Sequence, residues 1–190
     1  VTSAMFREAA EAPAAVERQL AANHAAVQAL ARRLRTSPPR AVVTVARGSS
    51  DNAATYARYL IETRLGLLTA SAAPSVSSVY HRQTGMQDTL VLAISQSGKS
   101  PDLLATLEQA RTAGAFIVAL VNAPDTPLEK LAHLALPLNA GPEHSVAATK
   151  SYVATLAALA DLIAAWSDDH ALSDALARLP QELEQAWACD

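Results

Sequence analysis

Short apolar runs alternate with longer amphipathic stretches along this chain. The runs are rich in Val, Ile, Leu and Ala and carry almost no charge, which is typical of strands buried on both faces of a parallel sheet. The clearest run is AVVTVA, at residues 41–46. We expect five such strands, at residues 41–46, 67–72, 89–94, 115–121 and 134–138.

The stretches between and around these strands have helical spacing. In residues 5–35, Val16, Leu20 and Val27 begin an apolar face that continues to Leu34. We expect further helices at residues 53–65, 74–82, 101–113, 146–166 and 172–188, with a short one opening at the capping-box pattern of Thr126.

Strands that alternate with helices imply βαβ units, right-handed crossovers and a parallel sheet. The predicted fold class is therefore α/β, a flavodoxin-like three-layer α/β/α sandwich with a five-stranded parallel sheet. We expect a helical lead-in at residues 1–40, the α/β domain at 41–168 and a connector helix at 169–190.

Composition narrows the class of protein. The chain has 190 residues, of which 51% are apolar and 17% charged, and its net charge is −3. This composition is typical of a globular protein, and the net charge argues against a basic surface that would bind nucleic acid. No apolar stretch is long enough for a membrane helix, and the beginning of the chain lacks the apolar core of a signal peptide. Cys189 is the only cysteine. We expect a cytoplasmic protein without disulfides or contact with membranes.

Three segments rich in small polar residues follow expected strands, at residues 48–52, 95–100 and 141–150. In open parallel sheets, ligands bind beyond the carboxyl ends of the strands, so we expect the three segments to converge there. In the second segment Ser100 suits an N-cap, and Pro101 suits the first helical position. Its hydroxyls and unpaired amides fit a phosphate at a helix N-terminus. The alternative is an ordinary, well-capped turn between a strand and a helix.

The three segments resemble the motifs of the sugar isomerase (SIS) domain family. They are Arg47-Gly48-Ser49-Ser50, Ser95-Gln96-Ser97-Gly98-Lys99-Ser100, and the stretch AGPEHSVAATK from Ala140 to Lys150. The opening residues 5–13, with Glu8, Glu11 and Pro13, resemble the family's lead-in. Within the family, the motifs are most similar to the first SIS domain in the isomerase half of glutamine–fructose-6-phosphate aminotransferases and to their glutaminase-free, deaminase-like relatives.

The resemblance implies a role for particular residues. The second segment would hold the phosphate of a sugar phosphate, the first would bind the phosphate or the open-chain sugar, and the third would line the hydroxyl end of the sugar, partly through its backbone. The implied site residues are Ser95, Gln96, Ser97 and Ser100; Gly48, Ser49 and Ser50; and Val146 and Ala148.

The resemblance also implies an activity, namely isomerisation of a hexosamine or ketohexose 6-phosphate with release or addition of ammonia. It implies neither a metal nor an organic cofactor. Two departures bear on this activity. Arg47 replaces a small residue of the family pattern, so that its cation either adds to phosphate attraction or lies in solvent, and Ala148 replaces a serine. No glutaminase segment precedes the motifs, which favours the deaminase-like branch.

In the family, the catalytic Glu, Lys and His come from a second SIS domain or a neighbouring subunit. The catalytic residues of this chain are therefore left unassigned. We expect the chain to be either the N-terminal half of a longer enzyme or a lone domain, and to pair with a second SIS domain or form a homodimer.

Other candidate residues fit structural roles better. The five histidines show no metal-ligand spacing, and His133, beside a strand, suits a structural role, whereas His144 lies in the third segment and can approach a ligand. Glu143 fits the role of a general base or, as we prefer, the role of a residue that orders its loop through hydrogen bonds. Nothing near Lys99, Lys130 or Lys150 indicates the desolvated amine of a Schiff base.

Three alternative functions fit the sequence less well. A non-catalytic sugar-phosphate sensor, as in RpiR-type regulators, would carry a helix-turn-helix ahead of the SIS domain, and residues 1–40 show no basic recognition helix. A nucleotide-binding domain would need a G-x-G-x-x-G or Walker sequence. A serine hydrolase would need a G-x-S-x-G elbow.

Overall fold

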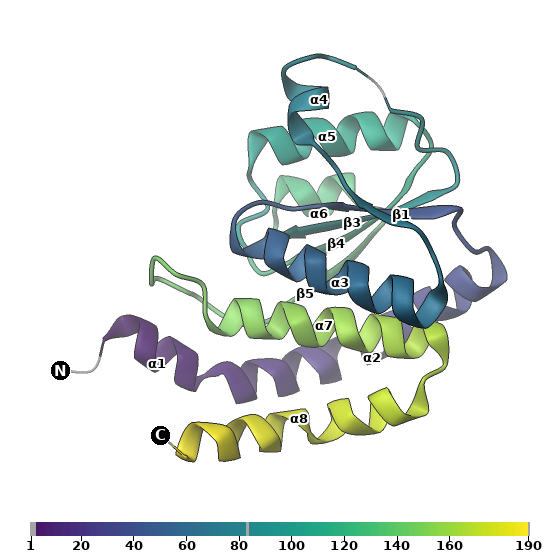
Figure 1. The fold of residues 1–190 in the computed structure, drawn as a ribbon. Coiled ribbons are helices and arrows are strands. Elements are labelled where there is room, and N and C mark those ends of the chain that lie inside the picture. Colours follow the sequence, from purple (N-terminus) through teal and green to yellow (C-terminus); the bar gives the residue numbers. More distant parts are fainter. Residues whose placement is uncertain (1–2, 83, 190) are drawn as a thin grey trace. The chain divides into compact units, whose positions relative to one another are not determined.

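The computed structural model describes residues 3–82 and 84–189. The chain divides into two compact units (Figure 1). Residues 37–137 form one unit, which we call the sheet unit. Residues 1–36 and 138–190 form the other, which we call the helical unit.

The sheet unit contains five strands in the order β2-β1-β3-β4-β5, and every pairing between them is parallel. The predicted α/β class with a five-stranded parallel sheet is confirmed. All residues of β3 are buried, as expected for the central strand of a sheet covered on both faces. The strands are β1 (Ala41–Val45), β2 (Thr69–Ser71), β3 (Thr89–Ser95), β4 (Phe116–Val121) and β5 (Leu134–Pro137).

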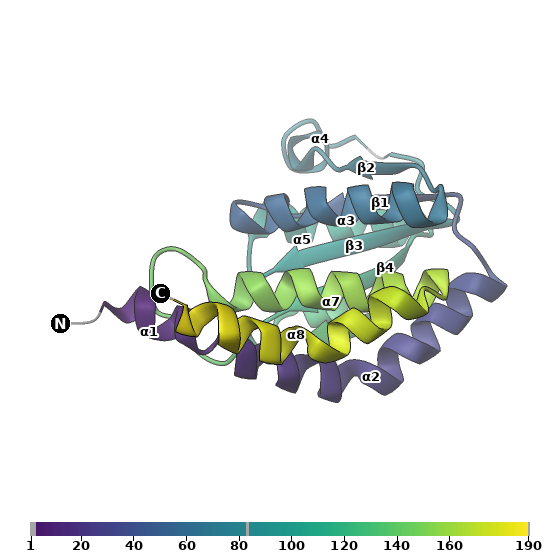
Figure 2. The same ribbon diagram turned by 60° about the horizontal axis from the view of Figure 1, so that its bottom comes forward.

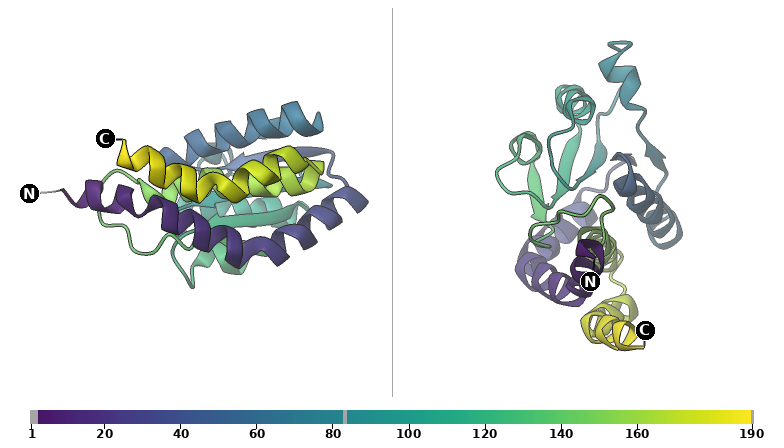
Figure 3. Two further views of the ribbon diagram at one scale, coloured as in Figure 1. Left: turned by 90° about the horizontal axis from the view of Figure 1, so that it is seen from below. Right: turned by 90° about the vertical axis from the view of Figure 1, so that its left-hand side faces the viewer.

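Helices cover both faces of this sheet. One face is covered by α3 (Ser49–Leu65), and the other by α5 (Pro101–Thr112) and α6 (Pro127–Leu131), as the right-hand view of Figure 3 shows. The short α4 (Pro74–Ser78) packs against α5. The sheet unit alone therefore has three layers. A core of buried apolar side chains from β3, β4 and α5 joins two of the layers: Val91, Ala93, Leu103, Leu107 and Ile117.

The strand order changes direction between β1 and β3. The chain leaves β1 through α3 to reach β2 on one side, and leaves β3 through α5 to reach β4 on the other. Because β1 and β3 are parallel neighbours, with Val45 paired to Ala93, their carboxyl ends lie side by side. Such a switch point is where ligands bind in this type of sheet.

The helical unit consists of α1 (Ala4–Ala10), α2 (Ala12–Thr36), α7 (Lys150–Ser167) and α8 (His170–Ala188). The helices α2, α7 and α8 pack against one another along their lengths (Figure 2). The predicted apolar face of α2 is confirmed, since Val16, Val27, Leu30 and Leu34 are all buried. No helix in the described part of the chain is both long and apolar enough to cross a membrane.

Several helix boundaries differ from those expected, and two of the differences bear on the third polar segment and the lead-in. The single helix expected at residues 5–35 is divided at Glu11, because Pro13 lies in the first turn of α2 and its ring cannot follow an uninterrupted helical turn. The helix expected to begin at Val146 begins at Lys150. Residues 141–149 instead form a loop, in which glutamate side chains accept the amides of His144, Ser145 and Thr149.

Candidate functional site

The first polar loop follows β1 and leads directly into α3. Gly48 is the N-cap of α3 and has a positive φ of 59°, a conformation that favours glycine. Ser49 and Ser50 are the first two residues of the helix, and the N-cap glycine provides no side-chain capping hydrogen bond. The helix therefore begins earlier than the expected residue 53. As a result, two serines and the amides of the first turn lie at the carboxyl edge of the sheet.

The second polar loop, which we call the serine loop, comprises residues 95–100 between β3 and α5. Ser95 is buried, and its hydroxyl accepts the amide hydrogen of Gly98 at 2.9 Å. The Gln96 carbonyl accepts the Ala123 amide at 3.0 Å. These two bonds fix the turn of the loop. Ser97 and Ser100 remain partly exposed and Gln96 is exposed.

Gly98 is the residue that makes this turn possible. It has a φ of +63°, and a Cβ built on it would lie 2.6 Å from both Cβ and Oγ1 of Thr126. Thr126 itself is fixed, because it forms a capping box with Glu129 at the start of α6. The serine loop thus packs directly onto the N-terminus of α6, and no larger residue fits at position 98.

The N-terminus of α5 carries the features of the predicted phosphate site. Ser100 is the N-cap and Pro101 follows, as expected. However, the Ser100 side chain forms no capping hydrogen bond, in contrast to the role that the sequence suggested for it. Instead, the carboxylate of Asp102 accepts the Leu103 amide at 2.9 Å. The Ser100 hydroxyl is therefore not occupied by capping.

Arg47 joins the first polar loop to this helix end. Its Nε donates to Oδ2 of Asp102 at 2.7 Å, and Nη2 contacts the same oxygen. These bonds from Arg47 are the main reason that the pKa of Asp102 lies below its ordinary value. The Arg47 side chain remains half exposed. The sequence suggested that the Arg47 cation either attracts phosphate or lies in solvent. The structure shows instead that the cation is paired, and its first effect is to neutralise a carboxylate at the positive end of α5.

The third polar loop, residues 141–149, belongs to the helical unit, so its convergence with the other two remains a prediction. Glu143 orders the end of this loop: its Oε1 accepts the amide and the hydroxyl of Thr149, at 2.7 and 3.0 Å, and its Oε2 contacts the Ser151 hydroxyl. The loop-ordering role that we preferred for Glu143 is confirmed. Val146 is fully exposed and Ala148 is partly buried.

Lys150 departs from its expected environment. The side chain is only 3% exposed, and its ammonium forms an ion pair with Glu11 at 2.5 Å. Sequence reasoning found nothing that would desolvate this lysine, because its partner lies 139 residues away. This ion pair anchors the first turn of α7 to the segment between α1 and α2.

His133 has the structural role that was expected. Its Nδ1 accepts the Ile117 amide at 3.0 Å, and its own amide donates to the Ile117 carbonyl at 2.9 Å, so it continues the pairing between β4 and the start of β5. Among the described residues, no cluster of His, Cys, Asp and Glu side chains could hold a metal ion.

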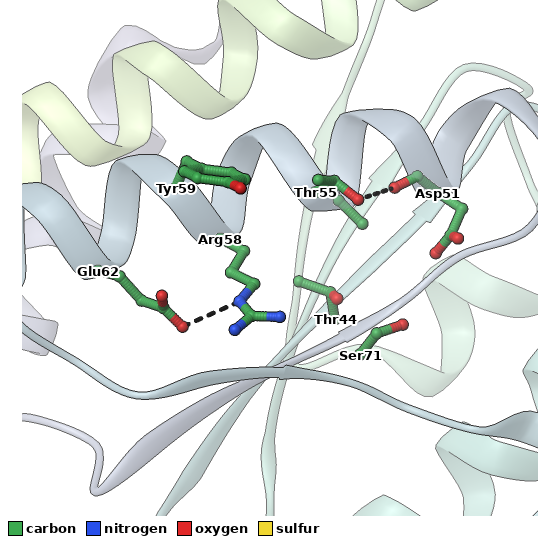
Figure 4. Close-up of a pocket in the computed structure, with 8 residues that line it drawn as sticks. Thr44, Asp51, Thr55, Arg58, Tyr59, Glu62 and Ser71 are labelled. Carbon is green, nitrogen blue, oxygen red and sulfur yellow. Dashed lines mark hydrogen bonds and ion pairs between the residues drawn. The ribbon is translucent and has the colours of Figure 1, made fainter.

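A polar hollow of about 270 Å³ lies between α3 and the paired strands β1 and β2 (Figure 4). Thr44 and Ser71 are paired across the two strands and line one side of it. Arg58 donates to Glu62 at 3.0 Å on the helix above them. The sequence alone does not reveal this hollow, although four of its lining residues recur at helical spacing along α3: Asp51, Thr55, Arg58 and Glu62. Its charged groups largely pair with each other.

Comparisons with known proteins agree with this architecture. A family model of the SIS domain matches residues 37–165, more than half of the chain. The chain is 40% identical over 127 residues to a glutamine–fructose-6-phosphate aminotransferase of Thermus thermophilus, a match that covers 66% of this chain and 20% of that enzyme. The chain therefore spans about a fifth of the length of this relative.

Two solved structures extend the comparison. A proposed phosphosugar isomerase from Silicibacter pomeroyi DSS-3 superposes with a TM-score of 0.94 at 44% identity, covering 97% of this chain and 57% of that one. The Vibrio vulnificus NanR protein, solved with ManNAc-6P, has a TM-score of 0.71 at 16% identity over 96% of this chain and 66% of its own, which shows a shared fold. The chain belongs to the SIS domain family.

Proposed function

We propose that this chain binds a phosphorylated sugar and that the serine loop holds the phosphate. One observation carries the proposal. Two parallel neighbours, β1 and β3, end side by side, and each is followed by a helix that has serine at or next to its N-cap and whose N-cap residue makes no side-chain capping hydrogen bond. Unpaired amides and hydroxyls at a helix N-terminus bind phosphate groups. The ion pair of Arg47 with Asp102 supports the proposal, because it offsets the negative charge nearest to this position.

The phosphate ligands in this proposal are Ser97 and Ser100, together with the Gln96 side chain and the amides of the loop. Ser95 contributes mainly by holding the turn, since its hydroxyl accepts from Gly98. Gly48, Ser49 and Ser50 would bind the phosphate or the open-chain sugar from the N-terminus of α3. Val146 and Ala148 would contact the hydroxyl end of the sugar.

We infer a hexosamine or ketohexose 6-phosphate as the ligand class. Supporting this, the relatives named above include a fructose-6-phosphate aminotransferase and a proposed phosphosugar isomerase. The chain would then form the sugar-phosphate-binding part of an isomerase, deaminase or aminotransferase-like enzyme in the cytoplasm. The reaction would open the sugar ring and move a proton between C2 and C1, with a base that we do not assign and without a metal or organic cofactor.

A second SIS domain or a second copy of this chain would complete such an enzyme. The Thermus and Silicibacter relatives are both longer than this chain, which supports a partner domain. Sedimentation at micromolar concentration tests the homodimer, which would migrate at twice the monomer mass. The alternative function, a non-catalytic sensor, would bind the same ligand and is distinguished by the absence of turnover in the complete protein.

Calorimetry with glucosamine 6-phosphate, fructose 6-phosphate and inorganic phosphate tests the phosphate site. The double variant Ser97→Ala/Ser100→Ala should weaken binding of all three ligands by roughly 2–4 kcal/mol, the scale of hydrogen bonds to a charged group. Ser173→Ala is the matched control, because that hydroxyl lies on α8 and donates to the Asp169 carbonyl. Unchanged affinity in the double variant would show that the phosphate binds elsewhere.

A further inference from the structure

Glu8 is a buried carboxylate on α1 that binds the third polar loop. Its Oε1 accepts the amide of His144 at 2.6 Å, and its Oε2 accepts the amide of Ser145 at 3.0 Å. The Ser145 hydroxyl also contacts Oε2. Glu8 is 7% exposed, although it lies on a short helix whose other residues are mostly open to solvent. All of these groups belong to the helical unit.

These contacts keep Glu8 ionised. Burial alone would favour the protonated acid, but the Ser145 hydroxyl and the two loop amides stabilise the carboxylate and lower the pKa of Glu8 to about 2. Consecutive amides that point at one carboxylate form a compact anion-binding turn. The carboxylate of α1 thus occupies this turn permanently at neutral pH and fixes its backbone.

The loop is held on both sides of its exposed tip. Glu8 binds the residues just before the tip, at positions 144 and 145, and Glu143 binds Thr149 just after it. Between these anchors lies Val146, a β-branched apolar side chain that is fully exposed. An apolar residue gains nothing from such exposure in the chain alone. Two glutamates therefore present a segment of three residues, 146–148, in a defined and open conformation.

We propose that Glu8 is a positioning residue, which fixes the third loop so that Val146 and Ala148 can recognise the sugar portion of the ligand. This inference rests on the proposed function, in which those two residues contact the sugar. It goes further by assigning sugar selectivity to a carboxylate on α1 that does not touch the ligand. The bare phosphate ion, which has no sugar portion, binds independently of Glu8.

The variants Glu8→Gln and Glu8→Ala test this role. Gln keeps the size of the side chain but places an amide group against one of the loop amides, and Ala removes both acceptors. We expect each variant to bind glucosamine 6-phosphate and fructose 6-phosphate about tenfold more weakly, the effect of losing roughly one net hydrogen bond. The affinity of each variant for inorganic phosphate should stay within about twofold of that of the unsubstituted chain.

Glu17→Gln is the matched control, because Glu17 is an exposed glutamate on α2 and the substitution changes the charge equally. Calorimetry gives the ratio of sugar-phosphate to inorganic-phosphate affinity for each protein, and circular dichroism verifies the fold. If Glu8 has a purely structural role, its variants bind both ligands more weakly and the ratio of the two affinities stays unchanged. That result would overturn the positioning role, and so would an unchanged affinity for both ligands. If the unsubstituted chain binds neither ligand, the proposed function itself is wrong.

Discussion

The Arg47 guanidinium, at the end of β1, donates to the Asp102 carboxylate in the first turn of α5. The two residues are 55 positions apart in the sequence and lie next to the two loops at the switch point of the sheet. A carboxylate at a helix N-terminus competes with any anion that the helix end could bind. By pairing with it, Arg47 reduces this competition and links the first polar loop to the N-terminus of α5.

Arg47→Ala should therefore weaken binding of inorganic phosphate by about three- to tenfold at low salt, since the Asp102 charge would then repel the ligand. The double variant Arg47→Ala/Asp102→Ala should recover most of this loss, because it removes the repelling charge as well. Isothermal titration calorimetry on the four proteins of the cycle measures the coupling. If the double variant binds as poorly as Arg47→Ala alone, then Arg47 contacts the phosphate itself.

Gly98→Ala, in the serine loop, should lower the free energy of unfolding more than an ordinary glycine substitution would. The positive φ alone costs about 1–2 kcal/mol in an L-residue, and the clash with Thr126 adds about 1–3 kcal/mol of overpacking. Gly66→Ala isolates the first effect, because Gly66 has a φ of +66° with nothing within 4 Å of the added Cβ. Urea unfolding should show a larger loss for Gly98→Ala. Equal losses in the two variants would mean that the loop shifts away from Thr126 without strain.

Gln19 is predicted to limit the stability of the helical unit. It is fully buried on α2, and neither its side-chain nitrogen nor its side-chain oxygen has a hydrogen-bond partner among the described residues. An unsatisfied buried amide destabilises the fold, so Gln19→Met should raise the free energy of unfolding by about 1–3 kcal/mol. Gln181→Met, at an exposed position of α8, serves as the control and should change it little. A loss of stability in Gln19→Met would show that the amide is satisfied in solution.

The contact of Glu8 with the third loop should persist in mild acid. The pKa of Glu8 is lowered to about 2, so protonation breaks the contact only near that pH. The contribution of this contact to stability is complete above the ordinary glutamate value near 4.5 and is lost as the pH falls through about 2. In NMR titrations, the Ser145 amide resonance should move with a midpoint near 2. A midpoint near 4.5 would mean that the loop does not hold the carboxylate.

The fold could be predicted from the sequence because local pattern determines it. The five apolar runs and the helices between them already predict a parallel sheet, and the polar segments after β1 and β3 mark the edge at which we propose that the ligand binds. The order of the strands, by contrast, follows from pairings such as that of Val45 with Ala93, which no local pattern encodes.

The features that the sequence analysis missed depend on contacts between distant residues. The pairing of Arg47 with Asp102 and the burial of Lys150 against Glu11 each join residues that are far apart in the chain. The course of residues 141–149 also depends on a distant residue, because Glu8 binds the amides of His144 and Ser145, 136 and 137 residues away. The apolar spacing from Val146 onward did not reveal that α7 begins only at Lys150.

The most direct test of the phosphate site is an NMR titration of the nitrogen-15-labelled chain with glucosamine 6-phosphate. Saturable shifts should concentrate on the amides of residues 96–100 and of Ser49 and Ser50, and inorganic phosphate should move the same serine-loop amides. Shifts that saturate elsewhere while those of residues 96–100 stay unchanged, or no saturation at millimolar ligand, would contradict the assignment of the serine loop as a phosphate site.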